Sequence, residues 1–257
     1  MVFDTGGRRK RVVQVVYGFL AIIMGASLLI VIGPFSIADV FTAQDAAESA
    51  ADSLDDQAAN IERKLVRNPS SETLLLALTR TRISAGNSRS EIDPATGQAT
   101  VTPEARQEYK LASDAWDRYL RAAEEPSPAG AQLAATALFS LAQAATTAAE
   151  SEAAIADAAA AQRIVAEARP NLGTVSTLAI YDYYAFRFSS GDRAARQAES
   201  FATSRAQRRS VRNQLAQIRR EAKRFQRQQA LLARVNRGQG KEQIQNPLGG
   251  LSGSTAP

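Results

Sequence analysis

Carboxylates are the side chains of this sequence whose type and spacing could do chemistry. Asp52, Asp55 and Asp56 lie close together, and Glu48 precedes them by one helical turn. Paired carboxylates can act as acid and base or bind a cation. Runs of charge on a helix are more commonly a solvated face, and we interpret this cluster as one. We therefore expect no catalytic, metal-binding or cofactor-binding residues, and no cofactor.

The amino-acid composition narrows the possible chemistry further. The 257 residues include no His and no Cys. Because His is the commonest general base and metal ligand, Ser-His-Asp and Cys-His catalysis and His-based zinc sites are excluded. A disulfide framework and lipid attachment to Cys are excluded as well. There is no phosphate-binding glycine-rich loop after a strand and no nucleophile elbow. The sequence favours a protein that is not an enzyme.

The apolar run Val12–Ile32 predicts where the protein works. It has 21 residues without a charge, and a helix of that length spans roughly 31 Å, close to the thickness of a bilayer core. Basic residues at 8–11 precede it and acidic residues follow it, which predicts a cytoplasmic N-terminus and an extracytoplasmic main domain. A cleaved signal peptide with a site at 36–38 is the alternative, although its apolar region is usually about 7–15 residues long. We expect a single-pass anchor in a bacterial plasma membrane.

Helix signals fill most of the remaining chain, so the predicted fold class is all-α. Caps, prolines and glycines divide it into helices that we expect to pack as consecutive antiparallel pairs. The expected helices cover 37–66, 70–86, 103–125, 127–147, 151–168, 172–189 and 192–237. Segment 88–102 contains the turn Asp93–Gly97 and is a small hairpin or an open loop.

These signals divide the chain into six segments of uneven charge. They are a cytoplasmic basic tail (1–11), a transmembrane anchor (12–33), a linker helix (34–69), a helical domain (70–203), a basic amphipathic C-terminal helix (204–240) and a disordered tail (241–257). Residues 39–125 carry 16 acidic and 10 basic side chains, a net charge of −6, whereas 187–241 carry 15 basic and 3 acidic ones, a net charge of +12. The two halves should attract different partners.

The order of large and small residues in the helix pairs resembles the tetratricopeptide repeat (TPR). The first pair offers Leu75, Leu78, Thr79 and Arg82, the turn Gly86-Asn87, and then Ala115, Tyr119, Ala122 and Pro126. The last pair offers Tyr181, Tyr184, Ala185 and Phe188, the turn Gly191-Asp192, and then Ala198 and Phe201. The middle pair is weaker, with Leu138, Leu141, Ala142 and Ala145 before Ala158, Val165 and Pro170. The family's period is about 34 residues, whereas the spacings here are 63 and 43. An unrelated Ala-rich helical bundle is the alternative.

The resemblance implies a short right-handed superhelix, or α-solenoid, whose concave face binds peptides or helices of partner proteins. Five residues would be exposed on the inner positions of the first helices, namely Arg80, Phe139, Gln143, Asp182 and Phe186. For the two phenylalanines a place in the core is the alternative. The layout is also similar to that of bacterial envelope proteins that accompany the Sec translocon or the cell-division machinery.

The basic C-terminal helix combines an apolar seam with a charged surface. The seam consists of Val211, Leu215, Ile218, Ala222, Phe225, Gln229 and Leu232, at alternating spacings of four and three. The basic surface consists of Arg208, Arg209, Arg212, Arg219, Arg220, Lys223, Arg224 and Arg227. Three interpretations stay open: the helix caps the solenoid, pairs in a coiled coil, or lies on anionic lipid, wall polymer or an acidic partner. Nucleic acid fits the charge but not the extracytoplasmic location.

The sequence therefore predicts a membrane-anchored, non-enzymatic scaffold or adaptor of the bacterial cell envelope. It would bind other envelope proteins through the groove of its helical repeats. The alternative is an envelope structural protein that binds anionic lipid or wall polymer through its basic C-terminal helix.

Overall fold

The structure is a computed structural model, and it describes residues 44–92 and 99–239. The chain divides into two units, Met1–Ala46 and Ala47–Pro257, and of the first unit only the start of one helix is described. The predicted basic tail, anchor, disordered tail and Asp93–Gly97 turn lie outside the described residues. Within the described ranges, no helix has the length and apolar character needed to cross a membrane.

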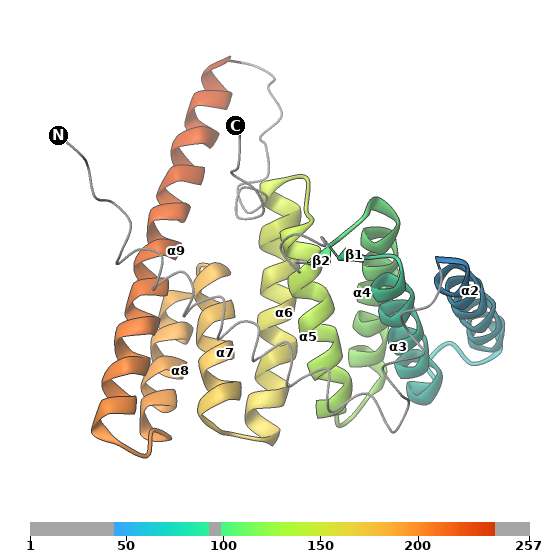
Figure 1. The fold of residues 1–257 in the computed structure, drawn as a ribbon, viewed down its shortest axis with the longest axis horizontal. Helices are drawn as coiled ribbons and strands as arrows, with labels where there is room; N and C mark the ends of the chain where they lie inside the picture. Colours follow the sequence, from blue (N-terminus) through green and yellow to red (C-terminus); the bar gives the residue numbers. More distant parts are fainter. Residues whose placement is uncertain (1–43, 93–98, 240–257) are drawn as a thin grey trace. The chain divides into compact units, whose positions relative to one another are not determined.

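The described residues confirm the all-α fold class (Figure 1). Their helices are α2 (Gln44–Arg67), α3 (Glu72–Ser88), α4 (Pro103–Ala122), α5 (Pro128–Gln143), α6 (Ala148–Ala168), α7 (Leu172–Tyr184), α8 (Phe188–Ser200) and α9 (Arg205–Gln239). Segment 88–102 contains a hairpin of two-residue strands, β1 (Glu91–Ile92) and β2 (Ala99–Thr100). The strands are antiparallel, with Glu91 opposite Thr100.

Side-chain caps fix where several helices begin. Ser71, Thr102, Ser127, Thr147 and Asn171 each accept a hydrogen bond from the backbone N–H three residues further along the chain. Because a cap is a local interaction, the predicted starts of α3, α4, α5 and α7 agree closely with the structure. Helix α6 begins three residues before its predicted start, because Thr147 already provides a cap.

The prediction of one helix over 172–189 is wrong. Helix α7 ends within this stretch, and Phe186 follows it in the left-handed conformation, with φ 57°. The backbone N–H of Arg187 donates to the carbonyl of Asp182 at 2.8 Å, as in the helix ends that usually place a glycine in this conformation. Since a phenylalanine occupies the glycine position, the sequence contains no stop signal here.

The prediction of one helix over 192–237 is wrong as well. The stretch contains most of α8 and α9, separated by Phe201–Ser204. The Ser204 hydroxyl accepts from the backbone N–H of Gln207 at 3.1 Å, and the Gln207 side chain accepts from the backbone N–H of Thr203 at 2.8 Å. Reciprocal caps of this kind begin a helix. The signal, a Ser followed three residues later by a Gln, is readable in the sequence.

Two glycines that the sequence analysis placed in turns are close-packing positions inside helices. Gly86 lies in α3, where an added Cβ would come within 2.5 Å of the ring of Tyr109 in α4. Gly191 lies in α8, where an added Cβ would come within 2.6 Å of the ring of Tyr183 in α7. In both helix pairs, therefore, the missing side chain makes room for a tyrosine of the partner helix.

Gly86→Ala and Gly191→Ala are each expected to destabilise the protein by up to about 2 kcal/mol. Alanine is the better helix former by about 1 kcal/mol, but forcing a methyl group into a packed contact costs about 1–3 kcal/mol. Urea unfolding measures the difference. Gly173→Ala, near the exposed start of α7, is the control and should destabilise the protein less, because an added Cβ there would meet only the side-chain oxygen of Asn171, at 3.3 Å. A stabilised Gly86→Ala or Gly191→Ala protein would contradict the close packing.

Consecutive helices pack as three pairs, α3 with α4, α5 with α6, and α7 with α8, and α9 packs on the last pair (Figure 1). Small residues line the contacts of the middle pair, so its helices can approach closely. They include Ala131, Ala134, Ala135, Ala142, Ala158, Ala159 and Ala161, all buried. One apolar cluster runs from α2 to α6 around Trp116, and a second runs from the end of α6 to α9 around Tyr183.

Candidate protein-interaction face

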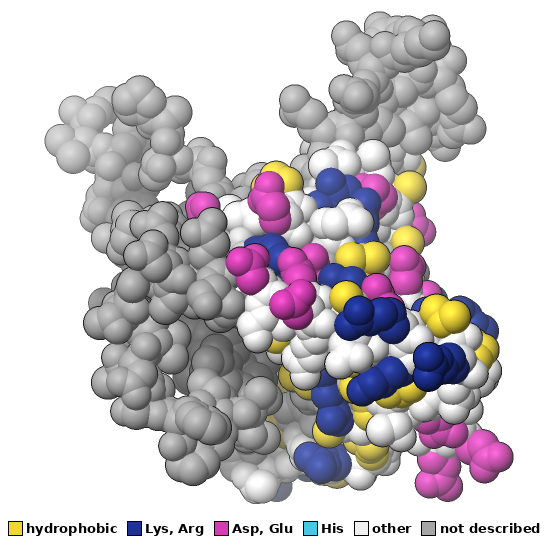
Figure 2. Space-filling model, turned by 90° about the vertical axis from the view of Figure 1, so that its right-hand side faces the viewer, with side chains coloured by type: hydrophobic (Ala, Val, Ile, Leu, Met, Phe, Trp, Pro, Cys, Tyr) yellow, Lys and Arg dark blue, Asp and Glu magenta, His cyan; other side chains and the backbone are white. Residues whose placement is uncertain are grey.

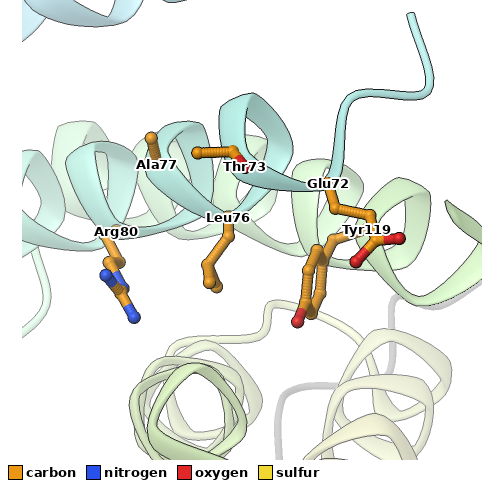
Figure 3. A pocket seen from close by; sticks show the side chains of 6 residues that line it. All are labelled: Glu72, Thr73, Leu76, Ala77, Arg80 and Tyr119. Atoms are coloured by element: carbon orange, nitrogen blue, oxygen red, sulfur yellow. The ribbon is translucent and has the colours of Figure 1, made fainter. Parts of the chain in front are cut away.

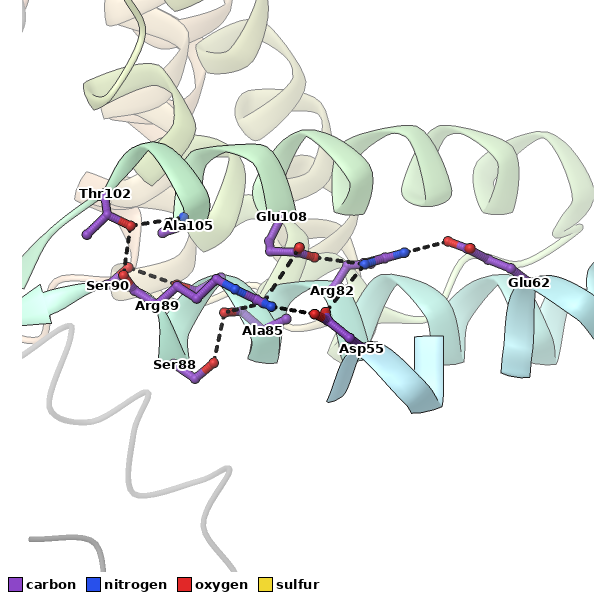
Figure 4. A network of polar contacts seen from close by, with 11 residues as sticks. Asp55, Glu62, Arg82, Ala85, Ser88, Arg89, Ser90, Thr102, Ala105 and Glu108 are labelled. Carbon is purple, nitrogen blue, oxygen red and sulfur yellow. Dashed lines mark hydrogen bonds and ion pairs between the residues drawn. The ribbon is translucent and has the colours of Figure 1, made fainter. Parts of the chain in front are cut away.

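Two arginines tie α2 to the first helix pair (Figure 4). Arg82 of α3 donates to Glu62 of α2 at 2.7 Å and to Glu108 of α4 at 3.0 Å. Arg89, directly after α3, donates to Asp55 of α2 at 2.6 Å and lies 3.6 Å from Glu108. Burial lowers the pKa of Arg82, but its bonds to Glu62 and Glu108 outweigh burial and leave the pKa raised. The network therefore stays charged and holds α2 against α3 and α4.

The carboxylates of the α2 cluster differ in their exposure to solvent and in their partners. Asp52 and Asp56 are exposed, in agreement with a solvated helix face. Asp55 is half-buried and paired with Arg89, so for this residue the interpretation is wrong. The side chain of Glu48 lies outside the described part. Among the described residues, no group of His, Cys, Asp or Glu side chains could hold a metal ion.

Charged side chains are unequally divided between the first and second helices of the pairs. Helix α5 contains no Asp, Glu, Lys or Arg, and α7 contains only Asp182, which is fully buried. Helices α4 and α6 contain eight and five charged residues. The first helices of the second and third pairs therefore present a surface without charge, whereas the second helices present a charged one.

We define the neutral face by solvent-accessible, uncharged residues of α3, α5 and α7. It comprises Thr73, Leu76 and Ala77 of α3, Gln132, Thr136 and Phe139 of α5, and Thr177, Tyr181 and Tyr184 of α7. Side-chain contacts join the three helices into one face. Phe139 and Tyr181 stack with ring centroids 5.0 Å apart and planes at 15°. Leu76 reaches α5 so closely that a Cβ added at Gly130 would lie 2.6 Å from its Cδ1.

A shallow hollow of about 260 Å³ lies at the α3 end of the neutral face (Figure 3). It is lined by Glu72, Thr73, Leu76, Ala77 and Arg80 of α3 and by Tyr119 of α4. In Figure 3, the side chains of Arg80, Leu76 and Tyr119 point to the same side. The hollow therefore combines the apolar surface of Leu76 with the charged groups of Glu72 and Arg80. The volume is below the roughly 300–1,000 Å³ of cofactor and ligand pockets. It suits a single side chain of a partner protein.

Three of the five predicted partner-binding residues lie on or beside this face. Arg80 is exposed and lines the hollow. Phe139 is half-buried in its stack with Tyr181, so it belongs partly to the core and partly to the surface. Gln143 is exposed at the end of α5. Whether they contact a partner stays a prediction.

The other two predicted binding residues are placed differently from the prediction. Asp182 is not exposed: it is fully buried, and its carboxylate accepts from Ser190 at 2.6 Å and from Arg163 at 3.2 Å. It joins α6, α7 and α8 from within. Phe186 is not part of a first helix but of the turn after α7, and its ring centroid lies 6.0 Å from that of Phe225 in α9. The end of α7 at Tyr184 displaces Phe186 from the predicted helix, whereas Asp182 is buried because α6 and α8 bring donors to it.

Helix α9 caps the helical domain through the first part of its seam. Leu215 and Ala222 are buried, and Val211 and Ile218 pack against the second apolar cluster. Gln229 is only partly buried, and the side chain of Leu232 lies outside the described part of the chain. Because the seam faces α7 and α8 up to Phe225, that part cannot pair with another copy as a coiled coil.

Some of the predicted basic surface of α9 serves to dock the helix. Arg212 pairs with Glu199 at 2.6 Å and Arg219 with Asp192 at 2.7 Å, both carboxylates lying on α8. Burial tends to raise the pKa of Asp192, but the bond from Arg219 outweighs it and holds the pKa below its usual range. Lys223 lies 5.4 Å over the ring of Phe188. The remaining basic residues, Arg208, Arg209, Arg220, Arg224 and Arg227, are exposed.

The charged helices have carboxylates whose ionisation the fold opposes. Burial raises the pKa of Asp117 in α4, and the neighbouring charge of Asp114 raises it further, against the effect of Arg121. Burial and the charge of Asp117 likewise raise the pKa of Asp157 in α6. Acidic and basic side chains are also interspersed on the surface seen from the side of α2 (Figure 2).

Asp117→Asn should therefore modestly stabilise the protein at about pH 7. A carboxyl group whose pKa is raised by folding contributes stability below its unfolded pKa, and this contribution is lost as the pH rises through the folded value. At about pH 7 folding opposes ionisation of the Asp117 carboxyl group, and an amide avoids that cost because it does not ionise. At about pH 3, below the usual Asp pKa, the carboxyl group is protonated as well, so the variant should lose its advantage. Urea unfolding at both pH values measures it, with the exposed Asp56→Asn as control. An equal effect at both pH values would contradict the electrostatic cause.

Comparison with protein-family models, with curated proteins and with solved structures found no match for this chain.

Proposed function

We propose that this protein is a non-enzymatic, membrane-anchored scaffold of the bacterial cell envelope that binds partner proteins along its neutral face. The proposal treats 12–33 as a single-pass anchor with a cytoplasmic N-terminus, and the helix pairs as a TPR-like α-solenoid capped by α9. Arg80, Phe139 and Gln143 would contact the partner. Asp182 and Phe186 would support the face from below rather than touch the partner.

The observation that carries the proposal is the lack of exposed charge across α5 and α7. Exposed helix surfaces are ordinarily rich in charge, and protein-interface cores are depleted of it and enriched in aromatic residues. The neutral face has both properties, since Phe139, Tyr181 and Tyr184 are only partly buried. An amphipathic helix or extended peptide could bury its apolar residues there without leaving a charge unpaired.

The same observation argues against other ligands for this face. A nucleic acid requires basic side chains along its phosphates, and Arg80 is the only Lys or Arg on α3, α5 or α7 that is exposed in the described structure. A cofactor requires a deeper pocket than the hollow beside α3. A polypeptide partner fits both the neutrality and the shallowness of the face.

A photo-cross-linking amino acid at Thr136, at the centre of the neutral face, tests the proposal in the native membrane. We expect one dominant cross-linked protein from the full chain. The same probe at Ala149, exposed on the charged helix α6, is the matched control. Equal products from both positions, or none from Thr136, would contradict the proposal.

Thr136→Glu is expected to weaken binding of that partner about tenfold or more. A buried, unpaired carboxylate at an interface is costly, whereas an exposed Glu on a free helix is nearly neutral. Circular dichroism should show unchanged helix content and stability. Ala149→Glu adds the same charge on α6 and should leave partner binding unchanged. Retained binding by Thr136→Glu would show that the neutral face is not the binding face.

The proposed topology has its own test. Because the chain contains no Cys, a single Cys replacing the exposed Glu125 between α4 and α5 can be labelled without background. Labelling of intact cells by a membrane-impermeant reagent is expected. Labelling only after lysis would place the helical domain in the cytoplasm, and release of the protein without detergent would refute the anchor.

A further inference from the structure

The outward side of α9 carries a row of arginines that has no described counter-charge. Arg220, Arg224 and Arg227 follow each other at spacings of four and three residues, so they lie on one side of the helix. All three are exposed, and no carboxylate in the described part of the chain pairs with them. Like charges at these spacings destabilise a helix. An anionic partner would remove that repulsion.

An exposed leucine continues the row. Leu231 lies four residues after Arg227, on the same side of α9, and it is 60% exposed. The seam residues Leu215 and Ala222, which face α7 and α8, lie on the opposite side. Leu231 therefore takes no part in the core of the domain. Of the described large apolar residues only one other, Val66 in α2, is exposed to this degree.

The rest of α9 strengthens the positive potential of the row. The helix contains eleven Lys and Arg residues and a single acidic one, Glu221. The later part of this helix also extends beyond the ends of α7 and α8 (Figure 1). The net charge of this helix, +10, is the largest of any described helix.

We propose that Arg220, Arg224, Arg227 and Leu231, the Arg–Leu row, bind the surface of an anionic phospholipid bilayer. The guanidinium groups would contact headgroup phosphates, and Leu231 would enter the boundary between headgroups and acyl chains. The exposed leucine favours lipid over other polyanions, because a nucleic acid or a wall polymer has no apolar layer to receive it. This surface is separate from the neutral face, and the proposal does not depend on a protein partner there.

Binding of the full chain to vesicles presented in trans tests the proposal. The protein is held in phosphatidylcholine nanodiscs and sedimented with vesicles of phosphatidylcholine, with or without phosphatidylglycerol. We expect binding only with phosphatidylglycerol, and loss of binding at high salt. Incorporation into nanodiscs is scored separately, so failure of the anchor prediction is distinguishable from failure of this one.

Replacing Arg220, Arg224 and Arg227 by Gln should weaken this binding about a hundredfold, since each basic residue near an anionic surface contributes about fivefold. The matched control replaces Arg63, Lys64 and Arg67 of α2 by Gln. These three are also exposed and clustered, but their helix carries six acidic residues. The control should bind like the unaltered protein. Equal losses in both variants would reduce the effect to net charge and overturn the proposal.

Leu231→Gln separates lipid from other polyanions because it leaves the charge unchanged. It should weaken vesicle binding roughly tenfold, the effect of losing part of a buried leucine's transfer free energy. Val66→Gln, which removes an exposed apolar side chain from α2, should have no effect. Unchanged binding of Leu231→Gln, or displacement of vesicles by an equal charge of double-stranded DNA or polyglutamate, would overturn the assignment to lipid.

Discussion

Trp116→Ala is expected to lower the free energy of unfolding by about 3–5 kcal/mol, the usual cost of truncating a large buried aromatic residue. Trp116 is 2% exposed, lies in the largest apolar cluster and has its ring centroid 5.1 Å from that of Tyr119. It also approaches α5, because a Cβ added at Gly130 would lie 3.4 Å from its ring. The residue thus joins the first helix pair to the second.

Urea unfolding followed by circular dichroism measures the effect of Trp116→Ala, since the chain has no other Trp to serve as a fluorescent probe. Trp116→Phe keeps an aromatic ring and should cost clearly less. Leu231→Ala, at an exposed position, is the control for surface truncation and should stay within about 0.5 kcal/mol of the unaltered protein. A loss below about 1 kcal/mol for Trp116→Ala would show that the two pairs do not depend on this contact.

Arg82→Met is expected to cost about 2–4 kcal/mol and to release α2 from the first helix pair. Breaking a buried ion pair from one side is expensive because the remaining charge is left without compensation. That charge is Glu108, which is 8% exposed and would retain only Arg89, at 3.6 Å. Glu62 and Asp55 are half-exposed, so water would replace part of their lost interaction and keep the total below the full cost of a buried pair.

Hydrogen exchange of α2 distinguishes this release from a general loss of stability. We expect amides of α2 to exchange faster in Arg82→Met than those of α5 and α6, which do not touch the network. Combining Arg82→Met with Glu108→Leu removes the stranded charge and should recover much of the stability. Slow exchange in α2 together with full stability of Arg82→Met would refute a structural role for the network.

The sequence by itself determined the features that depend on local interactions. The caps at Ser71, Thr102 and Ser127 act between residues three positions apart, so the starts of their helices could be predicted closely. The all-α class follows from the same signals. The basic and apolar sides of α9 could also be predicted, because they result from helical periodicity alone.

Only the tertiary structure decided which side chains are buried and which residues of different helices meet. Asp182 and Arg80 occupy similar positions in the helical pattern, yet one is fully buried and the other exposed, because α6 and α8 both bring donors to Asp182. The neutral face could have been noticed from the compositions of α5, which has no charged residue, and of α7, which has only Asp182. Its continuity could not, since it depends on Phe139 meeting Tyr181 across two helices.

The glycines and Phe186 show the physical reason for this division. A glycine allows a left-handed turn and also a close approach of two helices. The local sequence predicts turns at Gly86 and Gly191, whereas both glycines allow close approach of a tyrosine. The left-handed turn occurs at Phe186, whose ring lies near Phe225 of α9. Helix starts and periodic faces are properties of neighbours in the sequence, whereas burial and helix ends of this kind depend on residues that meet only when the chain folds.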